Sequence, residues 1–473
     1  LLFARKDGWR SLMKMHSFHS MKYFLLAAAL LLSCSHSKNN NEDQSVTAVA
    51  SASVQKEIFE TGKVIPKVVC KSNPASSFAL YLPSNYDTSK KFPALIFFDP
   101  HAGGEFVVKK YQHLAEEFHF ILIGSNDSKN GLTMDQTNQI ASNLISDATS
   151  RFSTFKNISL AGFSGGAKVA LYAAQQNQNI SSLVYCGAAE PLSSSSVKFS
   201  LLGFAGVNDM NYSDVIAFDQ ALQNFSASHF LIEWNGKHEW PDSVTFRNAF
   251  YWLAFNHMRS RDFGVDEGLI HQFRKETSNE LSLSNDVMET AMLQQKIISF
   301  LKGIDDVTSN ESSLAAIEKK PSYSNAVSQK QKSLQEETAI KQQYVNAFQT
   351  RDLLWWNQEI SKLQSEKDPM HQRLLGFISL ACYSISNNAI QQNNFPVAEK
   401  MLTIYKLADP KNSDQAFLEA CMYAKQGKND DAIQSLQRAA TLGLDDAAKI
   451  TEEPSLQSLM SDARLQELLA KMK

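Results

Sequence analysis

The sequence has little of several residue types, and each shortage excludes a class of protein. Its 473 residues include five cysteines, too few for a disulfide framework in a chain of this length. Twelve prolines and 19 glycines exclude collagen-like and proline-rich architectures. The formal net charge is −3, so no overall basic field indicates a nucleic-acid partner. With 43% hydrophobic residues, the chain is long enough and apolar enough for two or three globular domains.

Long apolar runs are also scarce. The one clear run, residues 23–32, is too short to span a bilayer, and none of spanning length follows it. Met21-Lys22 precedes this run and Ser33-Cys34 follows it. A signal peptide begins with a positively charged segment, continues with a short apolar stretch and ends in a small residue before the cleavage site. The N-terminus is therefore predicted to direct export.

Residues 31–34, Leu-Leu-Ser-Cys, resemble the lipobox of bacterial lipoproteins. In that family the cysteine is lipidated and becomes the mature N-terminus, which implies a lipid on Cys34. The alternative is an ordinary secretory signal with a chance cysteine. The resemblance predicts an upstream extension and signal peptide over 1–33 and a flexible Ser- and Asn-rich tether over 34–57. It places the protein in the cell envelope, periplasmic or at the outer membrane, with membrane attachment through the N-terminal lipid only.

Between residues 58 and 257 the hydrophobic pattern switches repeatedly between strand and helix. Continuous apolar runs at 94–98 and 120–124 are typical of buried strands. Residues 107–118, between them, have apolar side chains at helical spacing. Strands that alternate with helices predict βαβ units and a parallel sheet. Because ligands bind at the carboxyl ends of such strands, we expect the functional residues there.

A Gly-x-Ser-x-Gly motif, residues 162–166, directly follows the predicted strand at 158–161 and precedes a helix. In this context the tight turn holds the serine exposed at its tip, and small neighbours relieve the crowding. A free serine hydroxyl is a weak nucleophile, so it needs a base and the base needs an orienting carboxylate. Ser164 is therefore a candidate nucleophile, provided that the chain supplies both partners.

Both partners follow later strands, in the chain order serine, acid, histidine. Asp209 comes after the predicted strand 201–207, and His238 comes after the strand 230–234. The carboxyl ends of these strands can bring the two residues to Ser164. Asp214 is the alternative acid, but a carboxylate at that position is expected to begin the next helix.

Residues 58–257 are similar to the α/β-hydrolase domain of the serine-hydrolase type. The three candidate residues match the family's positions after its fifth, seventh and eighth strands. The stretches 81–87 and 98–104 resemble the branch that contains secreted esterases, feruloyl and acetyl esterases and polyester depolymerases. The resemblance implies a mostly parallel, doubly wound sheet and ester hydrolysis through an acyl-enzyme. It implies no metal and no cofactor.

The same resemblance implies two backbone N–H groups that bind the oxyanion. One belongs to the residue after the nucleophile, Gly165. The other belongs to the loop after the third strand, where it is His101 or Ala102. The family more often has His-Gly in this loop, so the choice between these two N–H groups stays open.

Three further residues are candidates for the substrate site. Ser125 and Asn126 end a predicted strand, where they either contact substrate or form a polar turn. Trp240 either walls the pocket or packs beneath the histidine loop. Only a short Ser-rich stretch separates Cys186 from Leu201, which leaves no room for the lid that many α/β-hydrolases insert there. The sequence thus favours an open site for small or polymer-linked esters.

After residue 257 the strand pattern disappears and amphipathic helices dominate. Residues 258–330 are predicted to be a helical connector and linker, because their end is rich in Ser, Asn and Lys. Within 331–473, segments recur at an offset of 34 residues, the helix–turn–helix period of the tetratricopeptide repeat. The aligned pairs are Ala398 with Ala432 and Leu402 with Leu436. This resemblance implies a surface for a peptide or protein partner, and an irregular helical bundle is the alternative.

The leading hypothesis is a lipid-anchored, extracytoplasmic serine hydrolase of carboxylic esters. A serine peptidase or thioesterase would use the same triad, because that triad serves all acyl transfer. From a different class, a repeat protein could recruit partners and keep the hydrolase fold only as a scaffold. The complete triad argues against a catalytically dead scaffold.

Overall fold

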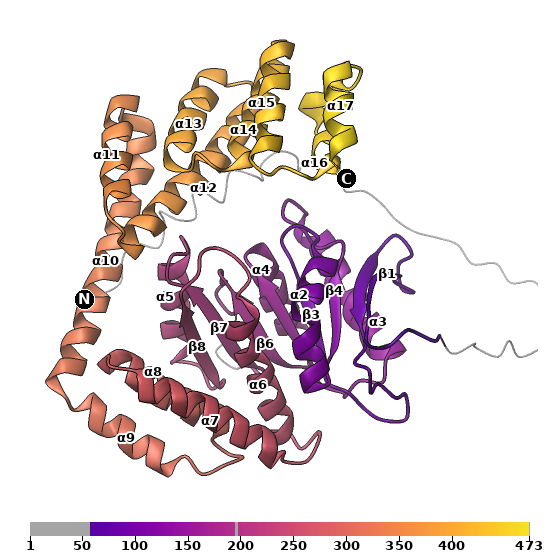
Figure 1. Ribbon diagram of the computed structural model, residues 1–473, viewed down its shortest axis with the longest axis vertical. Coiled ribbons are helices and arrows are strands. Elements are labelled where there is room, and N and C mark those ends of the chain that lie inside the picture. Colours follow the sequence, from indigo (N-terminus) through magenta and orange to yellow (C-terminus); the bar gives the residue numbers. More distant parts are fainter. Residues whose placement is uncertain (1–56, 194–196, 473) are drawn as a thin grey trace, which may run out of the picture. The chain divides into compact units, whose positions relative to one another are not determined.

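The computed structural model describes residues 57–193 and 197–472 (Figure 1). The predicted signal peptide, Cys34 and nearly all of the predicted tether lie outside the described residues. Across the described ranges, no helix combines the length and the apolar character needed to cross a bilayer.

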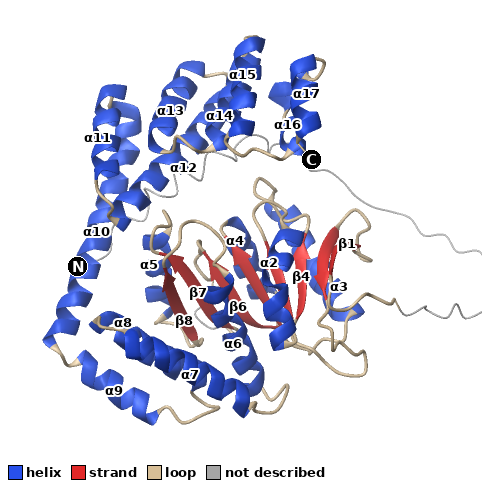
Figure 2. Ribbon diagram, in the orientation of Figure 1, coloured by secondary structure: helices blue, strands red, loops and turns tan. Residues whose placement is uncertain are grey.

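An eight-stranded sheet fills the first part of the described chain (Figure 2). Its strand order is β1-β2-β4-β3-β5-β6-β7-β8. β1 and β2 run antiparallel to their neighbours, whereas β3 to β8 are mutually parallel. This is the α/β-hydrolase arrangement, so the predicted fold class is confirmed. The strands are β1 (Val64–Val69), β2 (Ser77–Tyr81), β3 (Ala94–Phe98), β4 (Ile121–Ser125), β5 (Ile158–Phe163), β6 (Ile180–Cys186), β7 (Ser200–Gly206) and β8 (His229–Trp234).

The sheet separates two hydrophobic cores, and this explains why its central strands are apolar throughout. All five residues of β3 are buried. Leu95 and Phe97 face one core, whereas Ile96 and Phe98 face the other, because successive side chains alternate across a sheet. α2 and α6 cover the first face, and α3, α4 and α5 cover the second. These helices are α2 (Gly104–Phe118), α3 (Met134–Arg151), α4 (Gly165–Gln176), α5 (Tyr212–Leu222) and α6 (Ser243–Arg259).

The hydrophobic core of the hydrolase fold extends beyond the predicted boundary at residue 257. Phe273 and Phe300 are 1% and 0% exposed and belong to the same core as α2 and α6. They lie on α7 (Glu267–Leu283) and α8 (Val287–Leu301), inside the predicted connector. The Phe273 and Phe300 rings stack with centroids 5.1 Å apart. Amphipathic helices have the same pattern whether they pack on a sheet or on each other, so the sequence could not show this.

Two helices cover the end of the predicted connector and linker. α9 (Thr308–Glu318) follows α8, and α10 (Pro321–Thr350) continues without a break for 30 residues. Pro321 is the first residue of α10, a position at which proline's missing N–H has no helical partner to lose. The helical character expected for 258–330 is present, and the polar composition near its end belongs to the largely solvated early part of α10.

The C-terminal helices form two further hydrophobic clusters. α12 packs against α13, and α14 packs against α15. The residues paired by the 34-residue offset, Ala398 with Ala432 and Leu402 with Leu436, are all at most 2% exposed. These helices are α11 (Leu353–Ser365), α12 (Pro369–Gln391), α13 (Phe395–Ala408), α14 (Ser413–Lys425), α15 (Asn429–Thr441), α16 (Ala447–Thr451) and α17 (Ala463–Lys471).

The four cysteines in the described part of the chain are free and buried. Burial raises the pKa of the Cys70 thiol to about 11, with a further contribution from the negative charge of Asp147. Burial also raises the pKa of Cys186, Cys382 and Cys421. At pH 8 all four should therefore stay protonated, and the thiolate is the reactive form.

We expect the folded Cys34→Ala chain to react with Ellman's reagent very slowly at pH 8. In guanidinium chloride the same chain should release colour equivalent to the four cysteines. Rapid reaction of one thiol in the folded protein would contradict the burial described above.

Candidate active site

Ser164 lies between β5 and α4, at the turn predicted by the Gly-x-Ser-x-Gly motif. Its backbone has φ 51° and ψ −122°, a conformation that residues with a side chain rarely adopt. Two glycines make this turn possible. A Cβ on Gly166 would lie 1.9 Å from the Phe98 carbonyl oxygen, and one on Gly162 would lie 2.2 Å from the Gly166 carbonyl oxygen. The motif is therefore required by the close approach of helix and strand.

The structure brings Ser164, His238 and Asp209 into one hydrogen-bonded chain. His238 Nε2 is 2.9 Å from Ser164 Oγ. On its other side, His238 Nδ1 is 2.9 Å and 3.0 Å from the two carboxylate oxygens of Asp209. Because a carboxylate only accepts, Nδ1 carries the proton, and in the neutral ring Nε2 accepts from the serine hydroxyl. Asp209 is 1% exposed, whereas the His238 side chain is 21% exposed and reaches solvent.

Residues 207–211, here called the acid loop, hold Asp209 in place by backbone contacts. The Asp209 N–H donates to the Gly206 carbonyl at 3.0 Å, and the Asn211 N–H donates to Asp209 Oδ1 at 2.8 Å. The Asn208 N–H donates to the Gly236 carbonyl at 2.9 Å, which joins the acid loop to the histidine loop. Asp214 lies in the first turn of α5, where the sequence analysis placed it.

Asp99, which the sequence analysis did not select, joins two loops of the site. Its buried carboxylate accepts the N–H of His101 at 2.8 Å and that of Gly103 at 3.2 Å. It also accepts the indole N–H of Trp240 at 2.8 Å. Trp240 is 4% exposed and lies next to the Phe163 ring, so it packs beneath the histidine loop and does not line an open pocket. The Asp-Pro pair directly after β3 was the available signal.

The three N–H groups predicted to bind the oxyanion differ in whether another acceptor already engages them. Gly165 is the first residue of α4, where an N–H has no partner within the helix. The two loop candidates are engaged elsewhere. The His101 N–H donates to Asp99, and the Ala102 N–H donates to the Ser128 carbonyl at 2.9 Å. In this conformation neither loop N–H is available to an oxyanion, because the Asp99 side chain satisfies one and the Ser128 carbonyl of another loop satisfies the other.

Ser125 and Asn126 take part in a polar turn. Ser125 is 1% exposed, and its Oγ accepts the Ser128 N–H at 3.1 Å. The Asn126 side-chain amide donates to the Pro66 carbonyl at 3.0 Å. The same loop brings Asn130 next to Gly165, since a Cβ on Gly165 would lie 1.9 Å from the Asn130 amide oxygen. No pattern in the sequence indicated Asn130.

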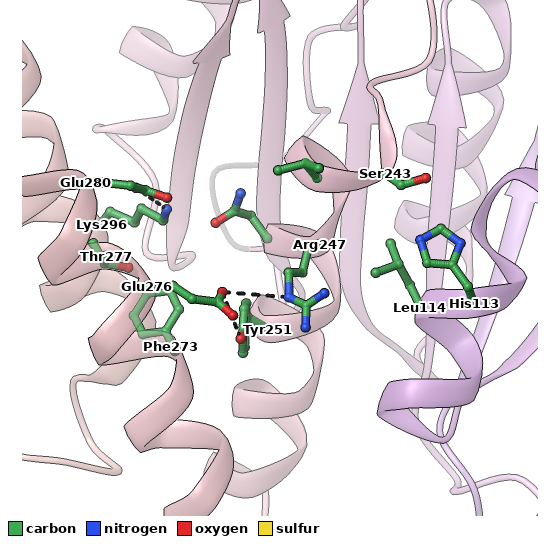
Figure 3. Close-up of a pocket in the computed structure, with 12 residues that line it drawn as sticks. His113, Leu114, Ser243, Arg247, Tyr251, Phe273, Glu276, Thr277, Glu280 and Lys296 are labelled. Atoms are coloured by element: carbon green, nitrogen blue, oxygen red, sulfur yellow. Dashed lines mark hydrogen bonds and ion pairs between the residues drawn. The ribbon is translucent and has the colours of Figure 1, made fainter. Parts of the chain in front are cut away.

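A separate cavity of about 420 Å³ lies between α2, α6, α7 and α8, and no triad residue lines it (Figure 3). Charged side chains on its wall are paired with one another. Arg247 Nε lies 3.6 Å from Glu276, and Lys296 Nζ lies 3.0 Å from Glu280. The wall therefore offers little uncompensated charge to select a ligand. Over the described ranges, no cluster of three or more His, Cys, Asp or Glu side chains could hold a metal ion.

The sequence matches no protein-family model and no curated protein. Similar solved structures include a hyperthermophilic esterase from the archaeon Pyrobaculum calidifontis, at 11% identity and a TM-score of 0.35 over 41% of this chain and 85% of that one. An S-formylglutathione hydrolase from Staphylococcus aureus is similar at 14% identity and a TM-score of 0.34, over 42% of this chain and 99% of that one. Est1E from Butyrivibrio proteoclasticus is similar at 12% identity and a TM-score of 0.32, over 39% of this chain and 96% of that one.

Proposed function

We propose that this protein is a serine hydrolase that cleaves carboxylic esters with Ser164, His238 and Asp209. One observation carries the proposal. The serine hydroxyl, both imidazole nitrogens and a buried carboxylate form a continuous hydrogen-bonded chain at the carboxyl end of parallel strands. Each spacing in that chain is within the range needed for proton transfer between nucleophile and base.

In the proposed reaction, Ser164 Oγ attacks the acyl carbon while His238 Nε2 takes its proton. Asp209 holds the Nδ1–H tautomer and stabilises the imidazolium that forms. The Gly165 N–H donates to the oxyanion of the tetrahedral intermediate. Collapse of that intermediate expels the alcohol, which receives the proton from His238. Water then attacks the acyl-enzyme by the same steps, which releases the acid and restores the serine hydroxyl.

Carboxylic esters are proposed over amides and thioesters on the resemblance of residues 81–87 and 98–104 to secreted esterases. A panel of p-nitrophenyl esters, sugar acetates, thioesters and peptides tests this order of preference. We expect a fluorophosphonate probe to label the wild-type chain and the esters to be turned over fastest. Faster hydrolysis of a thioester or a peptide would replace the substrate class and keep the nucleophile. Absence of both labelling and turnover would contradict the enzyme proposal itself.

For the C-terminal helices we propose a tetratricopeptide-like region that binds a peptide or protein partner. The proposal is supported by the two packed helix pairs and by the burial of the residues that the 34-residue offset aligns. Partner binding is proposed in addition to ester hydrolysis. It does not require the hydrolase fold to be an inactive scaffold.

The lipid anchor is a further part of the proposal, supported by the Leu-Leu-Ser-Cys sequence at residues 31–34. Cys34→Ala should move the protein from the membrane fraction to the soluble fraction when a bacterial host expresses the full sequence. The specific activity toward a soluble ester should stay within about twofold, because the substitution lies outside the hydrolase fold. Quantitative immunoblots of the two fractions provide the measurement. Retention of the variant in the membrane fraction would rule out the lipobox interpretation.

A further inference from the structure

A buried cluster of charged side chains lies between the helices after residue 320 and the hydrolase fold. Glu337 and Lys341 are on α10, and Arg373 is near the start of α12. They are 0%, 5% and 5% exposed. Buried charges are strongly unfavourable unless they are paired and hydrogen-bonded, so each of the three needs partners of opposite charge or hydrogen-bonding groups.

Glu337 lies at the centre of the cluster. Its Oε1 is 2.7 Å from Lys341 Nζ, and its Oε2 accepts a hydrogen bond from Arg373 Nε at 2.8 Å and lies 2.7 Å from Arg373 Nη2. Two guanidinium nitrogens of Arg373 therefore meet one carboxylate oxygen, while Lys341 meets the other, and such charge-assisted contacts are stronger than neutral hydrogen bonds. Glu337 thus orients two cations that come from different helices.

Both cations donate to the backbone of the acid loop. Lys341 Nζ donates to the Met210 carbonyl at 2.7 Å, and Arg373 Nη1 donates to the Val207 carbonyl at 2.7 Å. These two carbonyls flank Asp209 on either side in the sequence. Lys341 also donates to Ser213 Oγ at 2.9 Å, at the start of α5. The backbone around the proposed catalytic acid is therefore held at both ends by the helical part of the chain.

Packing around the cluster agrees with this arrangement. The Arg373 guanidinium carbon is 4.6 Å from the centroid of the Tyr212 ring, directly after the acid loop. Gly376 lies one turn further along α12, and a Cβ there would be 3.2 Å from Met210 Cβ. α12 therefore passes close to the residue next to Asp209.

We propose that Glu337, Lys341 and Arg373 are positioning residues that hold the acid loop, and hence Asp209, in the geometry that His238 requires. The inference rests on the proposed hydrolase function. None of the three residues touches Ser164 or His238 among the described contacts, so each acts through the backbone of the acid loop. Catalysis by the hydrolase fold then depends on contact with α10 and α12.

The test compares Lys341→Met and Arg373→Met with a matched control, Lys330→Met, in the full chain. Lys330 also lies on α10 and pairs with the hydrolase fold, but its partner is Glu233 on β8. We expect the two cluster variants to lower kcat for p-nitrophenyl acetate by about 10- to 100-fold with KM almost unchanged. Such a split indicates loss of an interaction that matters in the transition state. The control should keep kcat within about twofold.

A second measurement reports the geometry of the His238–Asp209 hydrogen bond in the absence of substrate. The proton on His238 Nδ1, shared with Asp209, should give a far-downfield proton NMR signal in the wild-type and Lys330→Met chains. In the cluster variants that signal should shift or broaden. Because removal of one partner from a buried ion pair can unfold a protein, Glu337→Gln/Lys341→Met is the additional variant. It removes one charge of each sign and should show the same loss of kcat.

Two results would overturn the positioning role. The first is a folded cluster variant, judged by circular dichroism, with wild-type kcat and an unchanged proton signal. The second is an equal loss of kcat in Lys330→Met, which would show that any weakened contact between α10 and the hydrolase fold has the same effect. If the wild-type chain shows neither turnover nor probe labelling, the proposed function fails. In that case the proton signal alone still decides whether the cluster sets the geometry of Asp209.

Discussion

Replacement of Ser164 by alanine should abolish ester hydrolysis and fluorophosphonate labelling while the chain stays folded. The side chain carries the proposed nucleophile and is only partly buried, so its loss removes chemistry and little packing. Since triad members act as a unit, His238→Ala should fall to a similar residual rate, about 10⁵- to 10⁶-fold below wild type in kcat. The double variant should lose little more. Steady-state rates, probe labelling and circular dichroism together provide the measurement.

The two aspartates supply the control for this result. Asp209→Asn should lower kcat by about 10⁴-fold, because the imidazole is then held in the wrong tautomer. Asp214→Asn should stay near wild type, because Asp214 lies in the first turn of α5 and Asp209 is the carboxylate on His238. The reverse pattern would show that the acid is misassigned. Wild-type activity in Ser164→Ala would contradict the nucleophile.

A chain that spans residues 58–257 should fail to fold, in spite of containing the whole triad. The truncation removes eight buried apolar members of one core of the sheet, and five of them lie on α7 or α8 and are at most 3% exposed: Ile270, Phe273, Ile297, Phe300 and Leu301. At about 1.5–3 kcal/mol for each buried side chain, their loss amounts to roughly 7–15 kcal/mol. That is as large as the whole stability of a typical domain. It would also leave Trp252 and Phe230 without their partner Phe300.

The comparison chain is 58–320, which keeps α7 and α8 and ends before α10. It should be soluble and unfold cooperatively in circular dichroism, whereas 58–257 should be insoluble or lack a thermal transition. A soluble 58–257 chain with a sharp transition would show that the hydrolase fold is independent of α7 and α8. Failure of both chains would extend the folding unit to α10.

The sheet and the triad geometry were predictable because each depends on a local signal. Buried parallel strands must be apolar on both faces, so continuous apolar runs such as 94–98 and 120–124 can be recognised in the sequence. The turn at Ser164 requires glycines at fixed positions on either side of the serine. Parallel topology brings the carboxyl ends of β7 and β8 to the same edge of the sheet as this turn. The chain order serine, acid, histidine then predicted Asp209 and His238 as the partners of Ser164.

Features that depend on contacts between distant loops were not predictable in the same way. Asp99 binds the Trp240 indole across 141 residues of sequence, and Arg373 reaches Val207 across 166. Neither pairing leaves a periodic trace in the sequence. The Ala102 N–H likewise donates to Ser128 in another loop, and a motif does not specify that contact.

The strained backbone at Ser164 has a consequence for laboratory evolution of this protein. Its φ of 51° and ψ of −122° cost on the order of 1–3 kcal/mol in a residue with a side chain. Glycine at this position would relieve the strain and abolish the nucleophile at once. A selection for heat resistance alone would thus enrich inert variants, and homologues with glycine there would be stable pseudoenzymes. Any thermostability screen must therefore measure ester turnover as well as the amount of folded protein that remains after heating.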